Sequence, residues 1–132
     1  MPDAETYTSV LEHFARYHDA CDRADFDAVL DQLAGATVRF GGLETDDAAV
    51  VRRAYETAQP APHPDGRRRT KHHLTNLILT ADGDAIVASA YYLRLGAGSD
   101  GRELLTSGRL EQVLIRDGAA WRVCRHTVTT DF

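Results

Sequence analysis

Apolar residues recur with a helical period along the first part of the chain. From about residue 6 or 8 to about residue 23 they return every three or four positions, which is the spacing of one helix face. This apolar stripe contains Val10, Leu11, Phe14 and Cys21. The pattern predicts a first helix that starts at Thr6 or Thr8, either of which is a suitable N-cap, and buries that face.

Two more helices are predicted before the middle of the chain. Asp25 is a good N-cap for a short helix over residues 26–33, which Gly35 ends. The third helix starts at Asp46 or Asp47 and carries alanines on one side as far as Ala58.

The segments next to these helices are interrupted by glycine and proline. Residues 36–40 are typical of a short strand, and the pair Gly41-Gly42 breaks it. The proline-rich segment 60–66 can be neither helix nor central strand, so it is a predicted loop.

Alternation typical of strands begins at residue 70. Two long pairs of strands flank Asp82-Gly83 and Asp117-Gly118, which are hairpin signals. The expected strands are residues 70–81, 84–95, 103–116 and 120–130, with a longer loop over 96–101. This order predicts an α+β fold in a single domain, residues 1–132. The antiparallel sheet should curve into a cone around the helices and enclose a pocket.

Composition narrows the classes of partner. The 132 residues are 43% hydrophobic and 27% charged with a net charge of −5, which argues against nucleic acid or an anionic membrane as the main partner. No apolar run approaches the ~20 residues of a membrane span, and the acidic N-terminus is unlike a signal peptide. We therefore expect a cytoplasmic protein, with Cys21 and Cys124 as buried thiols rather than a disulfide.

One carboxylate is out of place beside the apolar stripe. Asp22 lies at the end of the first helix, close to the stripe that also includes Tyr17 and His18. A buried carboxylate without a partner is costly, so Asp22 must be paired, half exposed or functional. On a helical wheel Tyr17 lies ~140° from Asp22. Both reach one pocket only if the helix unwinds or the cavity is wide.

Alternation along the strands indicates which side chains share a face. On the strand after residue 70, one face holds His72, Leu74, Asn76 and Ile78. On the next two strands, Ala88, Ala90 and Tyr92 share one face and Gly108, Leu110 and Gln112 another, and the small residues would leave space for a cavity. In the last strand either Arg125 or His126 faces the pocket, but not both.

Signatures of other chemistries are missing from the sequence. There is no GxSxG elbow, phosphate-binding glycine loop, HExxH pair or cluster of metal ligands. The basic run Arg67-Arg68-Arg69 is read as a solvated loop end, with capture of an anionic substrate tail as the alternative. The remaining chemistry is acid–base catalysis by Asp, His and Tyr, with no metal and no cofactor.

The segment Tyr17…Asp22-Arg23-Ala24-Asp25-Phe26, the strand Thr70-Lys71-His72 and the terminal Trp121-Arg122-Val123 hairpin occur together. In these features the chain resembles the SnoaL-like branch of the nuclear transport factor 2-like superfamily, which includes scytalone dehydratase and bile acid 7α-dehydratase. The resemblance implies that Asp22 orients His72, that His72 transfers a proton, and that Tyr17 donates to a substrate oxygen. It also implies a homodimer. The chain departs from the family where Cys21 replaces a tyrosine and where residues 108–112 lack the usual tyrosine and acid.

These features lead to two hypotheses. The first is a cofactor-independent lyase or isomerase that abstracts a proton next to a carbonyl of a hydroxylated, apolar polycyclic or aromatic small molecule. The second is a non-catalytic binding or assembly module of the same fold. An open cavity and a short Asp22–His72 distance would favour the first. The predicted pocket residues are Phe14, Cys21, Leu74, Asn76, Tyr92, Leu110, Gln112, Arg125 and His126.

Overall fold

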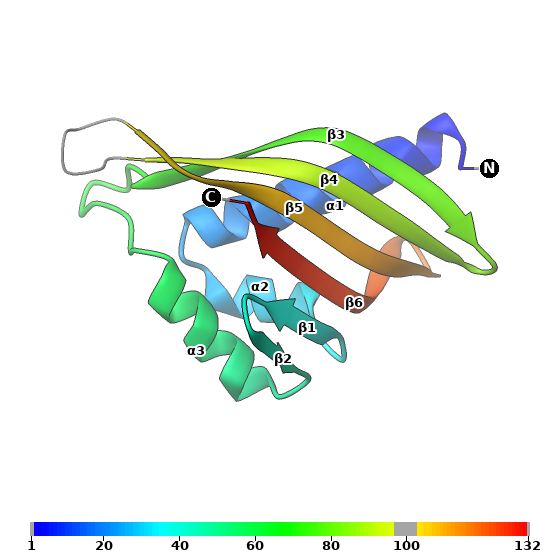
Figure 1. Ribbon diagram of the computed structural model, residues 1–132, viewed down its shortest axis with the longest axis horizontal. Helices are drawn as coiled ribbons and strands as arrows, with labels where there is room; N and C mark the ends of the chain where they lie inside the picture. Colours follow the sequence, from blue (N-terminus) through cyan, green and yellow to red (C-terminus); the bar gives the residue numbers. More distant parts are fainter. Residues whose placement is uncertain (1, 97–102, 132) are drawn as a thin grey trace.

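A curved, unclosed sheet of six strands covers three helices in the computed structural model, which describes residues 2–96 and 103–131 (Figure 1). The elements are α1 (Ala4–Asp22), α2 (Phe26–Gln32), β1 (Thr37–Phe40), β2 (Leu43–Thr45), α3 (Ala48–Ala58), β3 (Thr70–Asp82), β4 (Ala85–Gly96), β5 (Glu103–Asp117) and β6 (Ala120–Thr130). The α+β class is therefore confirmed. Of the predicted loop 96–101, residue 96 ends β4 and residues 97–101 lie outside the described residues.

The helix caps agree with the sequence except at the first helix. Asp25 and Asp47 cap α2 and α3, as expected. The prediction that Thr6 or Thr8 caps α1 is wrong, because Asp3 accepts a hydrogen bond from the Thr6 amide at 2.8 Å and starts the helix earlier. Aspartate is as good an N-cap as threonine or better, so the earlier site prevails.

The sheet has the order β2-β1-β6-β5-β4-β3. The last four strands form the predicted antiparallel meander, while β1 pairs with β6 in parallel. Strand β2 was not predicted: Gly41 and Gly42 turn the chain so that Leu43–Thr45 pairs with β1. A strand of three residues is too short to show an alternating pattern.

Both long hairpins turn one residue later than the sequence suggested. Asp82 pairs with Ala85, so that the turn consists of residues 83 and 84. Asp117 pairs with Ala120 in the same way. In each turn the glycine, Gly83 or Gly118, has a positive φ near 60°, which an L-residue with a side chain rarely adopts.

Two bulges change which side chains face the helices. In β3 the register shifts between Thr75 and Ile78, and Asn76 has φ +58°. As a result Leu77 is buried and Ile78 is exposed. The predicted face that ran from His72 through Asn76 to Ile78 is therefore wrong beyond Leu74, because an extra residue reverses the alternation.

The second bulge lies between β5 and β6. Val113 pairs with Arg125 and Leu114 with Val123, so Cys124 is the extra residue. Val123 and His126 are consequently both buried, although they are an odd number of positions, three, apart.

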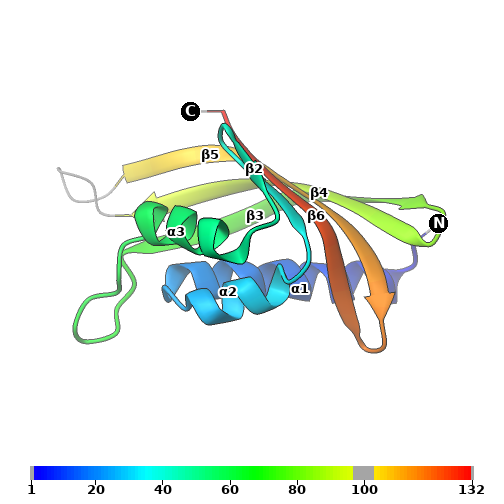
Figure 2. The same ribbon diagram turned by 90° about the horizontal axis from the view of Figure 1, so that it is seen from below.

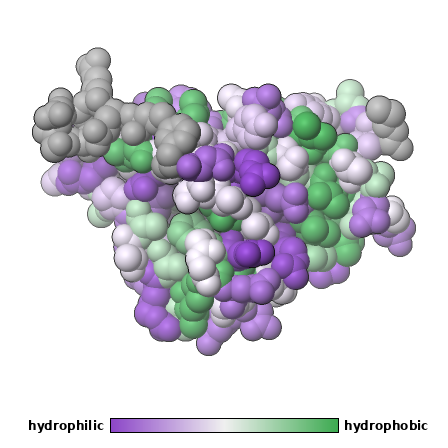
Figure 3. Space-filling view, viewed as in Figure 1, coloured by the Kyte–Doolittle hydropathy of each residue, from purple (hydrophilic) through white to green (hydrophobic). Residues whose placement is uncertain are grey.

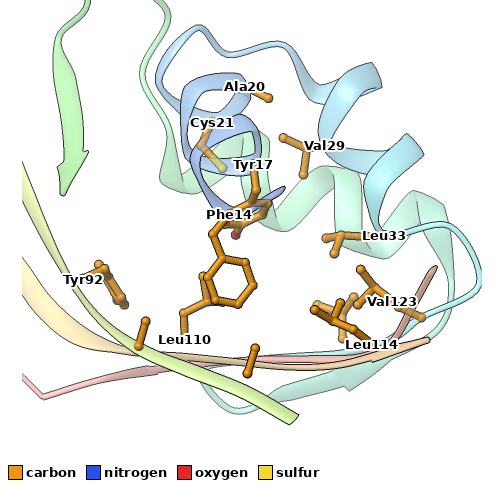
Figure 4. Close-up of a cluster of buried hydrophobic side chains, with 14 of the residues drawn as sticks. Phe14, Tyr17, Ala20, Cys21, Val29, Leu33, Tyr92, Leu110, Leu114 and Val123 are labelled. Atoms are coloured by element: carbon orange, nitrogen blue, oxygen red, sulfur yellow. The ribbon is translucent and has the colours of Figure 1, made fainter. Parts of the chain in front are cut away.

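The core lies between α1 and the concave face of the sheet (Figure 2). Phe14 is fully buried, and it points towards the sheet residue Leu110 in Figure 4. The ring of Tyr92 lies over Gly108, where an added Cβ would be 2.9 Å from that ring and 2.1 Å from the carbonyl of Thr129. Among the described residues, no helix is long and apolar enough to cross a membrane.

Candidate active site

A cavity of about 210 Å³ lies at the end of the core that is formed by α1, α3 and the sheet. Tyr17, His72 and three of the predicted pocket residues, Cys21, Tyr92 and Leu110, line it. Its volume exceeds the ~150 Å³ of a cavity that holds benzene and is below the ~300 Å³ of a typical drug-sized site. The cavity therefore fits a ligand of about one or two rings.

Asp22 and His72 are joined by two hydrogen bonds. The Nδ1 atom of His72 is 2.7 Å from Oδ1 of Asp22, and the backbone N–H of His72 donates to Oδ2 at 2.8 Å. The hydroxyl of Thr70 also donates to Oδ1, at 3.0 Å. The side chains of His72 and Asp22 are only 8% and 7% exposed. Asp22 thus fixes the orientation of the ring.

Burial alone would raise the pKa of Asp22, but the hydrogen bonds from His72 and Thr70 outweigh it and lower the pKa below its ordinary value. Asp22 is therefore a carboxylate and accepts the Nδ1–H of His72. Nε2 is then the ring nitrogen of His72 that is left to carry a lone pair, as a general base requires.

His18 stacks on His72, an arrangement that the sequence did not predict. The two ring centroids are 4.7 Å apart and the planes differ by 10°. Burial, followed by the nearness of His72, lowers the pKa of His18 to about 3. His18 is therefore a neutral ring at physiological pH, and it holds one face of His72.

Tyr17 belongs to a second buried cluster, together with Tyr55 and His126. The two phenol oxygens are 2.5 Å apart, and they lie 3.2 Å and 3.1 Å from Nε2 of His126. Burial raises the pKa of both phenols, so both keep their protons. Burial lowers the pKa of His126 to about 3, so this ring is neutral.

A hydrogen-bond chain behind His126 fixes which of its nitrogens is protonated. Gln112 Nε2 donates to Nδ1 of His126 at 2.9 Å, and Gln112 Oε1 is 2.8 Å from Nε2 of His13. The Nε2–H of His126 is then shared between Tyr17 and Tyr55, in agreement with the two nearly equal distances. One phenol donates to the other, which leaves one hydroxyl proton for Cys21 or for a ligand in the cavity.

Asp22 lies behind His72, outside the cavity lining. Tyr17 and His72 both line the cavity although α1 continues to Asp22 without unwinding. Asp22 does not itself have to reach the cavity, because His72, to which it is hydrogen-bonded, lines it. Asp22, His18 and His72 also border a surface groove, so the pair forms a wall between the cavity and solvent.

Several predicted pocket residues lie elsewhere. Phe14 is in the core, Asn76 is exposed at the bulge on the far face of the sheet, and Leu74 borders the surface groove. Gln112 is buried behind His126. Asn76 is misplaced because of the bulge, and the other three because a periodic pattern identifies a buried face without telling which part of it is filled.

Of the two candidates in the last strand, His126 faces inward, but it lies behind Tyr17 and Tyr55 and does not itself line the cavity. It is fully buried, and its Nε2 contacts two phenols that line the cavity. Arg125 is half exposed and pairs with Glu44 at 3.0 Å. Two arginines of the basic run form ion pairs within the protein: Arg67 pairs with Asp65, and Arg68 pairs with Asp19 on α1.

The cavity also contains residues that the sequence analysis missed, chiefly Tyr55 and Arg94. Arg94 continues the predicted inward face of β4 by one step after Tyr92, so alternation could have found it. Tyr55 follows Val51 by one helical turn, and both are buried. Among the side chains that the structure describes, in residues 2–96 and 105–131, no group of three His, Cys, Asp or Glu could hold a metal.

Comparison with known proteins identifies the family and the fold. The SnoaL-like domain family matches residues 2–127. Aln2 from a Streptomyces species is 18% identical, with a TM-score of 0.79 over 99% of this chain and 94% of that chain. ActVI-ORFA from Streptomyces coelicolor is 20% identical, with a TM-score of 0.79 over 97% and 98%. A protein from Catenulispora acidiphila, solved in complex with S-DNPA, is 24% identical, with a TM-score of 0.77 over 98% and 96%. No curated protein matches the chain in sequence.

Proposed function

Because the chain belongs to the SnoaL-like domain family, we propose that it is a cofactor-independent lyase or isomerase acting on a hydroxylated, largely apolar ring compound. The observation that carries the proposal is the 2.7 Å contact between His72 Nδ1 and Asp22 Oδ1 in the wall of a cavity. A buried histidine oriented by a carboxylate is an arrangement suited to proton transfer near neutral pH.

In the proposed reaction, Nε2 of His72 takes a proton from the carbon next to a carbonyl. The electron pair of the C–H bond forms a double bond to the carbonyl carbon, and the carbonyl oxygen takes up the negative charge of an enolate. A hydroxyl proton from the Tyr17–Tyr55 pair stabilises the enolate oxygen. The enolate then expels a β-hydroxyl group, which takes the proton from His72 and leaves as water. In an isomerisation, the same proton returns at a different carbon.

A binding or assembly module is the alternative function. It would be favoured by a core filled with its own side chains or by a separated Asp22 and His72. The cavity of about 210 Å³ and the short contact support the catalytic hypothesis instead. The S-DNPA complex of the Catenulispora protein supports a small-molecule ligand for either function.

The test uses a panel of cyclic β-hydroxyketones, with loss of the proton next to the carbonyl followed by NMR in D₂O. Asp22→Asn and His72→Ala should each lower the rate by ~10²-fold or more, as expected for loss of general base catalysis. Asp19→Asn removes an acid on the exposed side of the same helix, and it should leave the rate unchanged. Wild-type rates in both site variants would contradict the proposal. Binding of ketones without exchange of their protons would favour the binding module.

We further propose that the chain acts as a homodimer in the cytoplasm. The outer face of the sheet exposes Ile78 (62%) and Tyr91 (52%), which are large apolar side chains. Arg109 and Glu111 lie on the same face, and neither forms an ion pair with any described residue. A two-fold related copy could pair Arg109 with the other copy's glutamate. The free thiols of Cys21 and Cys124 suit a reducing compartment.

A further inference from the structure

Arg94 introduces a positive charge into the cavity wall. It lies on β4 directly opposite His72 on β3, in the register of the antiparallel pair. It lines the same cavity as His72 and Tyr17. The base and a guanidinium therefore border one space, and the proposed reaction assigns no task to the guanidinium.

The hydrogen-bonding capacity of Arg94 is only partly used. One terminal nitrogen, Nη2, donates to the carbonyl of Ala58 at 2.8 Å, at the C-terminal end of α3. The Nε atom is buried and has no hydrogen-bond partner in the described structure. A buried donor that is left unpaired costs about 1–3 kcal/mol, and more when it carries charge.

Arg94 also carries a positive charge that no described side chain pairs. Among residues 2–96 and 105–131, whose side chains the structure describes, no carboxylate forms an ion pair with Arg94. Asp22, whose charge acts on Cys21 as that of Arg94 does, is engaged by His72 and Thr70. The contact with Ala58 accounts for the position of Nη2, since a cation is favourable at a helix C-terminus. It does not explain a charge that faces a largely apolar cavity.

We propose that the ligand of this cavity is an anion, whose ring carries an ionised oxygen that Arg94 binds. This inference rests on the proposed function, because it takes the ligand of the cavity to be the substrate of the proposed reaction. Carboxylates and ionised enols or phenols share this chemistry, and a guanidinium matches both through its N–H donors. With the anionic oxygen at Arg94, the substrate ring is held beside His72. The charge of Arg94 also compensates the negative charge that proton abstraction adds.

The experiment measures binding by calorimetry with ligands that differ mainly in charge. Benzoate and benzamide form one pair, and 4-nitrophenolate and 4-nitrophenol, obtained by changing the pH, form the other. In the wild type the anion of at least one pair should bind about tenfold or more tightly than its neutral partner, as expected for a hydrogen bond to a charged group. Preference for benzoate identifies a carboxylate substrate, and preference for the nitrophenolate identifies an enol or phenol.

Two substitutions of Arg94 separate recognition from support of the fold. Arg94→Gln should abolish the preference for the anion, and Arg94→Lys should keep part of it. Arg39→Gln removes an exposed arginine on β1 and should leave the preference unchanged. Equal binding of anion and neutral ligand in the wild type, or an unchanged preference in Arg94→Gln, would overturn the inference.

Failure of this inference is distinguishable from failure of the proposed function. If Arg94 only supports α3, Arg94→Gln lowers the melting temperature without changing the ratio of the two affinities. The proton-exchange assay with the Asp22 and His72 variants tests the reaction, whereas the charge preference is measured without turnover.

Discussion

Burial decides the protonation of two histidines beside the cavity. His18 and His126 each have a pKa of about 3, chiefly because their charged forms would lose solvation. His72, which lies against His18, is instead oriented by a carboxylate. Three histidines in one part of the core thus have different roles, and only His72 has both a carboxylate partner and contact with the cavity.

The stability of the protein should fall as the pH is lowered below about 6.5. Between the ordinary histidine pKa of 6.5 and the value of about 3, the unfolded chain binds a proton at residue 18 that the folded chain does not bind. Each such histidine contributes up to ~1.4 kcal/mol of lost stability per pH unit. His18→Phe keeps a stacking ring that cannot bind this proton. The slope of its free energy of unfolding against pH should therefore be smaller than that of the wild type by the contribution of about one proton.

Urea unfolding at a series of pH values between neutral and mildly acidic would measure this slope. His73→Phe changes an exposed ring and is the control for losing a histidine. An unchanged slope in His18→Phe would mean that the stack on His72 does not exclude the proton from residue 18.

At the scale of the elements, Asn76 determines which part of β3 reaches the core. Its φ of +58° is in the left-handed region, which asparagine tolerates better than most residues. The bulge turns Leu77 inward after His72 and Leu74 have already faced inward. Without it, the long strand could not present both the histidine and Leu77 to the helix side.

Replacement of Asn76 should therefore depend on backbone preference rather than on lost contacts. Asn76→Val places a β-branched residue at positive φ and should lower the free energy of unfolding by about 1–3 kcal/mol. Asn76→Gly, which adopts this conformation freely, should change it by less than about 1 kcal/mol. Denaturant unfolding of the two variants measures the difference, and equal values would show that backbone strain is not the determinant.

The sequence predicted the long elements because their periodic patterns extend over several turns or residue pairs. The three helices and the two hairpins were foreseen, whereas β2 has three residues and no pattern. Alternation failed at Asn76 and Cys124, where an extra residue changes the face. No local signal in the sequence marks those bulges.

The site was predictable only in part. Asp22 and His72 are fifty positions apart, and their pairing was expected from the family resemblance rather than from their spacing. The stacking of His18 depends on how α1 crosses β3, which pattern alone does not specify. Arg94 was within reach of the alternation argument, because it follows Tyr92 on the same face of β4.

At the scale of the whole molecule, the two faces of the sheet differ. The concave face covers the helices, and Figure 3 views the opposite face, where hydrophobic and polar side chains are interspersed. Ile78, Tyr91, Arg109 and Glu111 border a hollow of about 330 Å³ on this outer face. Apolar groups ringed by charges are typical of an interface between subunits.

If the outer face joins two copies, one charge at its apolar position should separate them. Ile78→Glu buries an unpaired carboxylate in the interface and should convert a dimer into a monomer in sedimentation velocity. Lys71→Glu, an exposed change nearer the start of the same strand, serves as the control. A wild type that sediments as a monomer at micromolar concentration would refute the dimer.

The parallel pairing of β1 with β6 joins Thr37 to Arg125 across 88 positions of the chain. The sheet therefore cannot be completed while the chain is being synthesised until the residues of β6 are available. His126, which holds the two phenols, is on that same strand. A nascent or C-terminally shortened chain would thus have the helix with Asp22 and the strand with His72, but an unfinished cavity. Folding that depends on contacts so distant in sequence is slow.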